Sequence, residues 1–360
     1  MFRSVLSVLL TASLLFTLQI MPEASYRPGV SAEAAALIDA ESGEILYIKN
    51  GTERKAPASL TKIMTALVVI ESCDLYDIVT VPREAVGIEG SSAYLTAGEK
   101  FTAEELLYAL MLQSANDAAV ALALHCAGSV ETFACKMNEK AAYLGLSGTH
   151  FANPHGLPDK DHYSTALDMA RLLSFCMENE KFAGISGSRS YIIKAGAERK
   201  ARQFINHNRL LFEDVGVTGG KTGYTKSGGR CLCTYYEKDG IKLCAATLNA
   251  PDDWADHRAL YEYGRGLYAP VTLDAAGIYE LHIVGGVIDT VTATVYRDET
   301  ALIKKGAEVK KAVYMRRFEY APVREGERIG YIVFFAGEKE IRRIPLYADI
   351  TAVKKQTGFF

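Results

Sequence analysis

The sequence predicts an α+β fold, in which an antiparallel sheet packs with a cluster of helices and is followed by a small all-β C-terminal domain. Up to residue 268, apolar runs typical of strands are interspersed with stretches whose apolar residues have helical spacing. Beyond Pro270 only short alternating runs remain, separated by glycines and charged turns. The chain has 360 residues, 49% of them hydrophobic, which is enough to bury two moderate cores.

The first domain, residues 33–268, begins with two apolar runs joined by a polar turn, which predict a hairpin over residues 34–39 and 45–49. Thr102 to Glu105 form a capping-box pattern before leucines at helical spacing, so a helix is expected up to Ser114. Further helices are predicted over residues 59–71, 116–128, 165–177 and 253–267. Strands are predicted over residues 215–222, 229–236 and 241–248, the last two joined by a tight turn.

The second domain, residues 272–352, has alternating runs at 288–296, 309–316 and 328–335 and no helical stretch. Its boundary with the first domain is expected at residues 268–272. Residues 353–360 would form a short tail. The apolar residues near this end give a poor apolar face, and Gly358 interrupts any helix, so we expect no membrane anchor there.

The N-terminus has the pattern of a secretory signal peptide. Arg3 precedes a mostly apolar run from Ser4 to Met21, after which polarity rises. Small residues allow cleavage after Ala24 or within the triplet 30–32, so residues 1–24 or 1–32 would be removed. An uncleaved N-terminal anchor is the alternative, which the hydroxyl groups inside the run disfavour. Either way, we expect the rest of the protein to work outside the cytosol, in the cell wall or periplasmic space or at the outer face of the membrane.

Charge and cysteine content exclude several classes. A net charge of -3 gives no electrostatic reason to bind nucleic acid. The odd number of cysteines cannot all pair within one chain, and because most lie in apolar stretches we interpret them as small buried hydrophobes. Cys231 and Cys233 could form a metal pair, but no second pair stands at zinc-ligand spacing, so no metal or other cofactor is expected. The seven cysteines are at positions 73, 126, 135, 176, 231, 233 and 244.

A hydroxyl and an amine lie three residues apart at Ser59 and Lys62, where a helix is expected to begin. Both side chains would therefore emerge on one face, about a turn apart. A serine needs an adjacent base to become a nucleophile, and a lysine serves if burial or a neighbouring cation lowers its pKa. On its own, the pair is more typical of a helix cap beside a solvated lysine.

Two further strings add polar groups. Ser114 and Asn116 lie at the break between two predicted helices, where the hydroxyl could relay a proton and the amide could hold Lys62. The alternative is a turn whose residues cap helix ends. Lys221, Thr222 and Gly223 end a predicted strand: a cation beside a hydroxyl suits a terminal carboxylate, and a glycine lets a substrate backbone lie close. A solvated glycine-rich turn is the alternative there.

In this order, the three strings resemble the active-site signature of the penicillin-recognising serine enzymes. The surrounding sequence resembles the D-alanyl-D-alanine carboxypeptidase family in particular. The resemblance covers about residues 34–267, and the β segment that follows looks like that family's C-terminal domain. The stretches that carry it are 58–66, 153–157, 162–170 and 206–211.

The resemblance implies a penicillin-binding, β-lactamase-like fold and a two-step acyl transfer. Ser59 would attack the bond between the last two D-alanines of a peptidoglycan stem peptide, with Lys62 as base and Ser114 passing the proton on. The remaining site residues would bind substrate: Asn116, Lys221, Thr222 and Gly223, with the backbone N–H of Tyr224 and that of Ser59 stabilising the oxyanion. β-Lactam antibiotics would acylate the same serine. Arg209 is a weaker candidate for carboxylate support, with a surface role as its alternative.

The sequence alone leaves three other functions open. A β-lactamase of the same superfamily would need a glutamate for deacylation, and residues 153–158 offer none. A D,D-transpeptidase or endopeptidase differs only in the acceptor, and the lack of a large extra module favours the carboxypeptidase. A catalytically dead wall-binding protein would not be labelled by penicillin.

Overall fold

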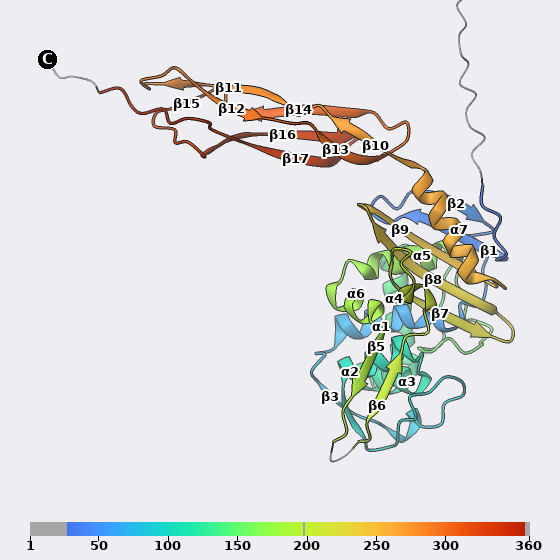
Figure 1. The fold of residues 1–360 in the computed structure, drawn as a ribbon. Coiled ribbons are helices and arrows are strands. Elements are labelled where there is room, and N and C mark those ends of the chain that lie inside the picture. Colours follow the sequence, from blue (N-terminus) through green and yellow to red (C-terminus); the bar gives the residue numbers. More distant parts are fainter. Residues whose placement is uncertain (1–26, 197–198, 357–360) are drawn as a thin grey trace, which may run out of the picture.

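The computed structural model describes residues 27–196 and 199–356. Figure 1 shows a helical and sheet-containing part from which a slender all-β part extends. The main sheet of the first part has five strands in the order β2-β1-β9-β8-β7, and every neighbouring pair is antiparallel. These strands are β1 (Ala34–Asp39), β2 (Ile45–Lys49), β7 (Val217–Thr225), β8 (Gly229–Lys238) and β9 (Ile241–Leu248).

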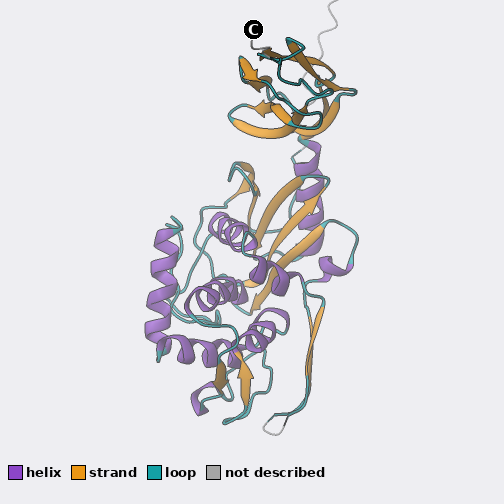
Figure 2. Ribbon diagram, turned by 90° about the vertical axis from the view of Figure 1, so that its left-hand side faces the viewer, coloured by secondary structure: helices purple, strands orange, loops and turns teal. Residues whose placement is uncertain are grey.

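Helices cover both faces of this sheet (Figure 2). The one helix on the outer face is α7, whose Leu260 and Tyr261 pack with Leu232 of β8. The other face packs against α5 and the remaining helices, and there Cys231 and Cys233 of β8 enter the larger core. The helices are α1 (Thr61–Ser72), α2 (Ala103–Leu112), α3 (Asn116–Ala127), α4 (Val130–Tyr143), α5 (Ala166–Met177), α6 (Glu180–Gly187) and α7 (Asp253–Gly266).

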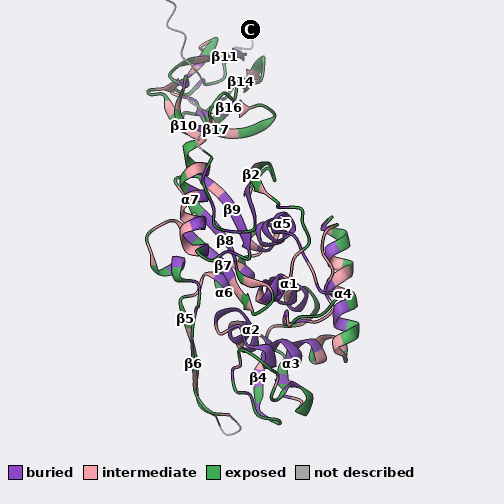
Figure 3. Ribbon diagram, turned by 90° about the vertical axis from the view of Figure 1, so that its right-hand side faces the viewer, coloured by how far each residue is buried: buried purple, intermediate pink, exposed green. Residues whose placement is uncertain are grey.

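Strand β8 shows why both faces are buried. Alternate residues of a strand point to opposite sides, and every residue from Cys231 to Tyr236 is buried (Figure 3). Five of these six buried residues are apolar, so the sequence predicts the strand without an amphipathic alternation.

Most predicted elements of the first part are present, with shifted ends. The capping box at Thr102 and Glu105 is confirmed, since each side chain accepts from the other residue's backbone N–H. The helix predicted from Ser59 begins at Thr61, after a 3-10 turn at Ala58–Leu60. The predicted strand 215–222 extends to Thr225, so residues 221–223 lie within a strand and not at its end.

Several elements were not predicted. Helix α4 follows an N-cap at Ser129, and α6 follows one at Asn179. Two small hairpins, β3 with β4 and β5 with β6, flank α2. The remaining bounds are β3 (Ile78–Thr80), β4 (Lys100–Thr102), β5 (Ser190–Ile193), β6 (Arg202–Ile205), and the 3-10 turns η2 (Arg83–Ala85) and η3 (Arg209–Phe212).

The part beyond α7 is all β, as predicted, and has a buried core of its own. Its described strands form a β14-β16-β17 sheet, a β12-β11-β15 sheet and a β10-β13 pair. Ion pairs of Lys304 with Glu44 and of Lys339 with Glu41 join it to the first part. The strands are β10 (Tyr268–Leu273), β11 (Gly277–Val284), β12 (Thr290–Val295), β13 (Glu299–Lys304), β14 (Val309–Met315), β15 (Phe318–Tyr320), β16 (Arg328–Ala336) and β17 (Lys339–Tyr347).

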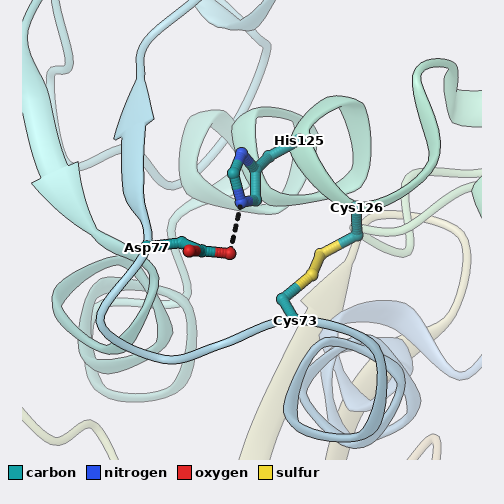
Figure 4. Close-up of a disulfide and its surroundings, with 4 residues drawn as sticks. All are labelled: Cys73, Asp77, His125 and Cys126. Carbon is teal, nitrogen blue, oxygen red and sulfur yellow. Dashed lines mark ion pairs between the residues drawn. A yellow bond between two sulfur atoms is a disulfide. The ribbon is translucent and has the colours of Figure 1, made fainter.

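The interpretation of the cysteines was wrong for three of the seven. Cys73 and Cys126 form a disulfide, because the C-terminal ends of α1 and α3 bring their Cα atoms to 6.2 Å (Figure 4). Cys135 is exposed on α4. The apolar stretch before Cys126 reflects helix packing, and the residues next to either cysteine carry no sign of which residue lies opposite. The other four are buried as free thiols: Cys176, Cys231, Cys233 and Cys244.

The predicted signal peptide lies almost wholly outside the described residues. Among residues 27–196 and 199–356, no single helix has the length and hydropathy to cross a membrane, although α3 and α4 pass the same test as a pair bent by 85°. The described part of the tail is extended: Val353 accepts a backbone hydrogen bond from Val287, and Lys355 donates one to Gly285. Residues 27–196 and 199–356 contain no group of three or more His, Cys, Asp or Glu side chains that could hold a metal ion.

Candidate active site

Ser59 lies in the 3-10 turn that precedes α1, and Lys62 lies in the first turn of that helix. The Lys62 Nζ is 2.9 Å from the Ser59 Oγ, so the two side chains form a hydrogen bond, as their spacing in the sequence predicted. Ala58, immediately before the serine, has a φ of 50°, an uncommon conformation for a residue with a side chain. Backbone strain of this kind is often found where a catalytic side chain is held in place.

The Lys62 amine is buried and surrounded by oxygen atoms. Besides Ser59 it contacts the Oδ1 of Asn116 and the backbone oxygen of His155, both at 2.7 Å. Burial first, and the nearby charge of Lys221 second, lower the pKa of Lys62 well below its usual range. A neutral amine has two N–H donors, which suit the two carbonyl oxygens, and one lone pair, which suits the Ser59 hydroxyl. The site therefore favours a lysine that can accept the proton of Ser59.

A second layer fixes the turn that carries Ser59. The N–H of Ala152 donates to His162 Nδ1, so the ring of this buried histidine carries its proton on Nε2. That nitrogen donates to the Thr61 hydroxyl at 2.7 Å, which in turn donates to the backbone oxygen of Ala58 at 2.8 Å. Burial lowers the pKa of His162 to about 4, which keeps the ring neutral at pH 7. Each donor thus has one defined acceptor, and the strained residue before Ser59 is held in place.

Gly156 closes the same turn from the other side. Its φ is 87°, and a Cβ built there would lie 1.9 Å from the Ala58 oxygen. No side chain fits at this position.

Ser114 and Asn116 lie where α2 ends and α3 begins, as predicted. Ser114 has a φ of 60° and its side chain lines the cleft described below. Asn116 holds Lys62 through Oδ1, and its Nδ2 donates to the Glu89 oxygen at 2.5 Å. Its amide therefore connects the lysine to the loop between η2 and β4.

Lys221, Thr222 and Gly223 lie on β7, an edge strand of the main sheet. Lys221 is buried, and its Nζ donates to the Thr222 oxygen at 2.8 Å. Burial lowers its pKa to about 7. A Cβ at Gly223 would lie 3.1 Å from the backbone nitrogen of Ser59. A glycine therefore also suits this position because β7 packs closely against the 3-10 turn that carries Ser59. The sequence did not indicate this packing.

These residues meet at an open cleft of about 290 Å³. Of the predicted site residues, Ser59, Ser114, Thr222, Gly223 and Tyr224 line it, whereas Lys62, Asn116 and Lys221 lie behind that surface. The Tyr224 side chain is largely exposed. Sequence reasoning missed five lining residues: Ser91, His207, Arg230, Asp253 and Trp254.

One of the missed residues had a signal in the sequence. His207 lies inside the stretch 206–211 that carries the resemblance, although it was given no role. Burial first, then the nearby Lys221 charge, lower its pKa. Arg230 follows the predicted strand start, and nothing in the sequence pairs it with Asp253. Arg209, the candidate for carboxylate support, is exposed and pairs with Glu213 at 3.0 Å, so its surface alternative is the correct one.

Several known proteins are similar to this chain in sequence and in fold. A family model described as D-alanyl-D-alanine carboxypeptidase matches residues 21–252. The DacF carboxypeptidase of Bacillus subtilis is 32% identical over 91% of this chain and 87% of its own. The DacC carboxypeptidase of Escherichia coli is 31% identical over 92% and 86%. The crystal structure of penicillin-binding protein 5 from Haemophilus influenzae superposes with a TM-score of 0.65 at 27% identity, covering 91% of this chain and 99% of that one. This chain belongs to the D-alanyl-D-alanine carboxypeptidase family.

Proposed function

We propose that this serine D-alanyl-D-alanine carboxypeptidase acts through an acyl-enzyme on Ser59. The buried Lys62 amine, 2.9 Å from the Ser59 Oγ and with a lowered pKa, is the observation that carries the assignment. Ser59 attacks the carbonyl carbon between the last two D-alanines while Lys62 accepts its proton. The C–N bond then breaks, and Ser114 passes a proton to the departing amine of D-alanine.

Substrate binding follows from the groups around the cleft. The edge of β7 can pair with the extended end of a stem peptide. Lys221 and Thr222 bind the terminal carboxylate, and Asn116 helps to hold the scissile amide. The backbone N–H groups of Ser59 and Tyr224 stabilise the oxyanion. Water then attacks the ester and releases the shortened peptide. Penicillin forms a penicilloyl ester on the same serine, which we expect to hydrolyse slowly because, among the described residues, no glutamate lines the cleft.

The domain division and location are part of this proposal. Residues 33–268 form the catalytic domain, and residues 272–352 form a separate β domain with its own core. An N-terminal signal directs the chain out of the cytosol. Any membrane association is weak or depends on an uncleaved N-terminus, because the tail is extended along the β domain as far as Lys355.

Mass spectrometry after penicillin treatment tests the assignment, together with D-alanine release from a stem pentapeptide. We expect one adduct on Ser59, and S59A should lose both the adduct and the release. S91A is the matched control, because Ser91 lines the same cleft but takes no part in the proposed mechanism. This variant should retain both the adduct and the release of D-alanine. An adduct on Ser114 or Ser91 would show that the nucleophile is misassigned.

A further inference from the structure

The β domain contains a cavity of its own, of about 390 Å³, which no step of the proposed function uses. This volume is in the usual range for a small-molecule site. The cavity is lined by β14, β16, Leu281 of β11 and Glu319 of β15, and among the described residues it shares none with the cleft at Ser59. Strand β15 lies at the end of the β part that is remote from α7 (Figure 1). We call this space the β-domain cavity.

Two tyrosines line the β-domain cavity. Tyr314 of β14 and Tyr331 of β16 lie opposite each other in the antiparallel register, so both side chains are on one face of the sheet. Their rings stack, with centroids 5.1 Å apart and planes inclined by 25°. The Arg343 guanidinium lies 4.5 Å from the centroid of the Tyr331 ring, and Tyr314 is 47% exposed. The cavity therefore has an ordered aromatic surface that a ligand can reach.

A bulge in β16 shapes the same cavity. Arg328 and Gly330 pair with consecutive residues of β17, so Ile329 between them is an extra residue. A bulge of this kind bends a strand and redirects its side chains. Gly330 is needed at the bend, because a Cβ there would lie 2.4 Å from the Met315 Cγ. As a result Ile329 is buried beneath the cavity, whereas Arg328 is exposed beside it.

The charged residues that line the β-domain cavity balance one another. Arg316 and Glu319 form an ion pair. Arg328 and Glu327 also line the cavity, and neither has an ion-pair partner among residues 27–196 and 199–356. Two cations and two anions give no net attraction to a phosphate, an acidic peptide or a polycation. They do place N–H donors beside carboxylate acceptors, which suits a neutral ligand that carries hydroxyl and amide groups.

We propose that the β-domain cavity binds the glycan chain of peptidoglycan through one of its N-acetylated amino sugars. The inference rests on the proposed function, in which the substrate is a stem peptide attached to that glycan. A sugar ring has apolar C–H faces that pack on tyrosine rings. Its hydroxyl groups bind carboxylates and guanidinium groups, and its acetamido group both donates and accepts a hydrogen bond. The lining therefore matches a neutral amino sugar in both shape and charge.

A second binding site would change how the enzyme meets its substrate. The cleft at Ser59 binds a stem peptide, and the β-domain cavity would bind the glycan of the same polymer. When two sites bind one polymer, the second contact forms at the effective concentration that the first one sets. The cavity should therefore favour polymeric peptidoglycan over a free pentapeptide, even where its affinity for a single sugar unit is low.

The test compares kcat/KM for D-alanine release from isolated peptidoglycan sacculi with that from a soluble stem pentapeptide. Calorimetry with tri-N-acetylchitotriose measures binding of an amino sugar directly. The informative variant is Y314S/R328Q. The matched control is Y296S/R317Q, because Tyr296 and Arg317 are exposed in the same domain and do not line the cavity. R328Q alone guards against a folding defect, since Arg328 has no hydrogen-bond partner among the described residues.

We expect Y314S/R328Q to lose about 10-fold or more of kcat/KM on sacculi and to stay within about twofold of the wild type on the pentapeptide. R328Q should lose less, in the same direction, at an unchanged melting temperature. The wild type and the control should bind the trisaccharide, and the double variant should not.

Failure of the trisaccharide to bind the wild type would overturn the inference, as would unchanged activity of Y314S/R328Q on sacculi. Equal losses on sacculi and pentapeptide would also overturn it, because the cavity would then only support the fold. All three outcomes leave the acyl-enzyme on Ser59 intact. A wild-type enzyme that releases no D-alanine from the pentapeptide would instead contradict the proposed function itself.

Discussion

The disulfide is expected to stabilise the fold without shaping the active site. Cys73 and Cys126 join the C-terminal ends of α1 and α3 (Figure 4). Lys62 and Asn116 lie at the N-terminal ends of the same helices. At a rise of about 1.5 Å per residue, the bond is about 15 Å from these groups along each helix. Its loss should therefore affect the unfolded state more than the cleft.

The size of the effect follows from the chain that the bond closes. The two cysteines are 53 residues apart. The loop-closure relation gives about 4 kcal/mol of stabilisation at 25 °C for a loop of this length. For a domain of this size, about 2–4 °C of melting temperature corresponds to each kcal/mol, so the midpoint should fall by about 8 °C or more.

The variant C73A/C126A tests this by thermal melting and by acylation with penicillin at 25 °C. We expect the lower midpoint and an acylation rate within about twofold of the wild type. C135S is the control and should change neither, because Cys135 is exposed and unpaired. Thiol counting on the denatured, unreduced wild type should find five reactive cysteines. Seven reactive thiols would refute the bond, and a slowed acylation at an unchanged midpoint would refute its separation from the site.

Three further predictions address the site and the N-terminus. K62M should not be acylated by penicillin in intact-mass measurements, because Ser59 then lacks its base; a labelled variant would contradict the assignment. G156A should both melt lower and acylate more slowly, since its Cβ would lie 1.9 Å from the oxygen of the residue before the nucleophile; G184A, with open space around it, is the control. Signal cleavage should occur before Val30, because the buried Asp256 accepts hydrogen bonds from the N–H groups of residues 31 and 32; N-terminal sequencing that begins at Glu33 would rule this out.

The sequence predicts local elements well and long-range pairs poorly. The capping box, the strands β8 and β9 and helix α7 have signals within a few neighbouring residues, and they form where expected. Helix α4 was missed although Ser129 caps it. A smaller share of its residues is apolar than in α2, so packing against α1 and α3 stabilises it.

The active site divides in the same way. The three motifs identify Ser59, Lys62 and Lys221, because their spacing is local and their order is specific. The support around them is invisible in the sequence. His162 reaches Thr61 across 101 residues, and Asp253 reaches Arg230 across 23. Such contacts depend on how the chain folds back, and single residues of this kind carry no pattern of their own.

The burial of Lys221 leads to a last prediction, which concerns the stability of the folded protein. Burial lowers the pKa of Lys221 from its usual 10.5 to about 7 in the folded protein. Between these values the unfolded chain binds more protons than the folded one, so stability rises with pH across this window. A shift of this size corresponds to roughly 5 kcal/mol of destabilisation at pH 7 or below.

The variant K221M separates this cost from the hydrogen bond that it removes. Lys221 donates to the Thr222 oxygen, a bond that contributes only about 1 kcal/mol net, so the desolvation cost dominates. K221M should therefore melt higher than the wild type at pH 7, lose most of that advantage near pH 10, and bind carboxylate-containing β-lactams poorly. Melting midpoints between pH 6 and 10 measure the difference, with K226M, on the turn after β7, as the control. A variant that is less stable than the wild type at pH 7 would mean that the folded protein supports a charged Lys221. In that case Lys221 would already carry its positive charge before a carboxylate-containing ligand binds.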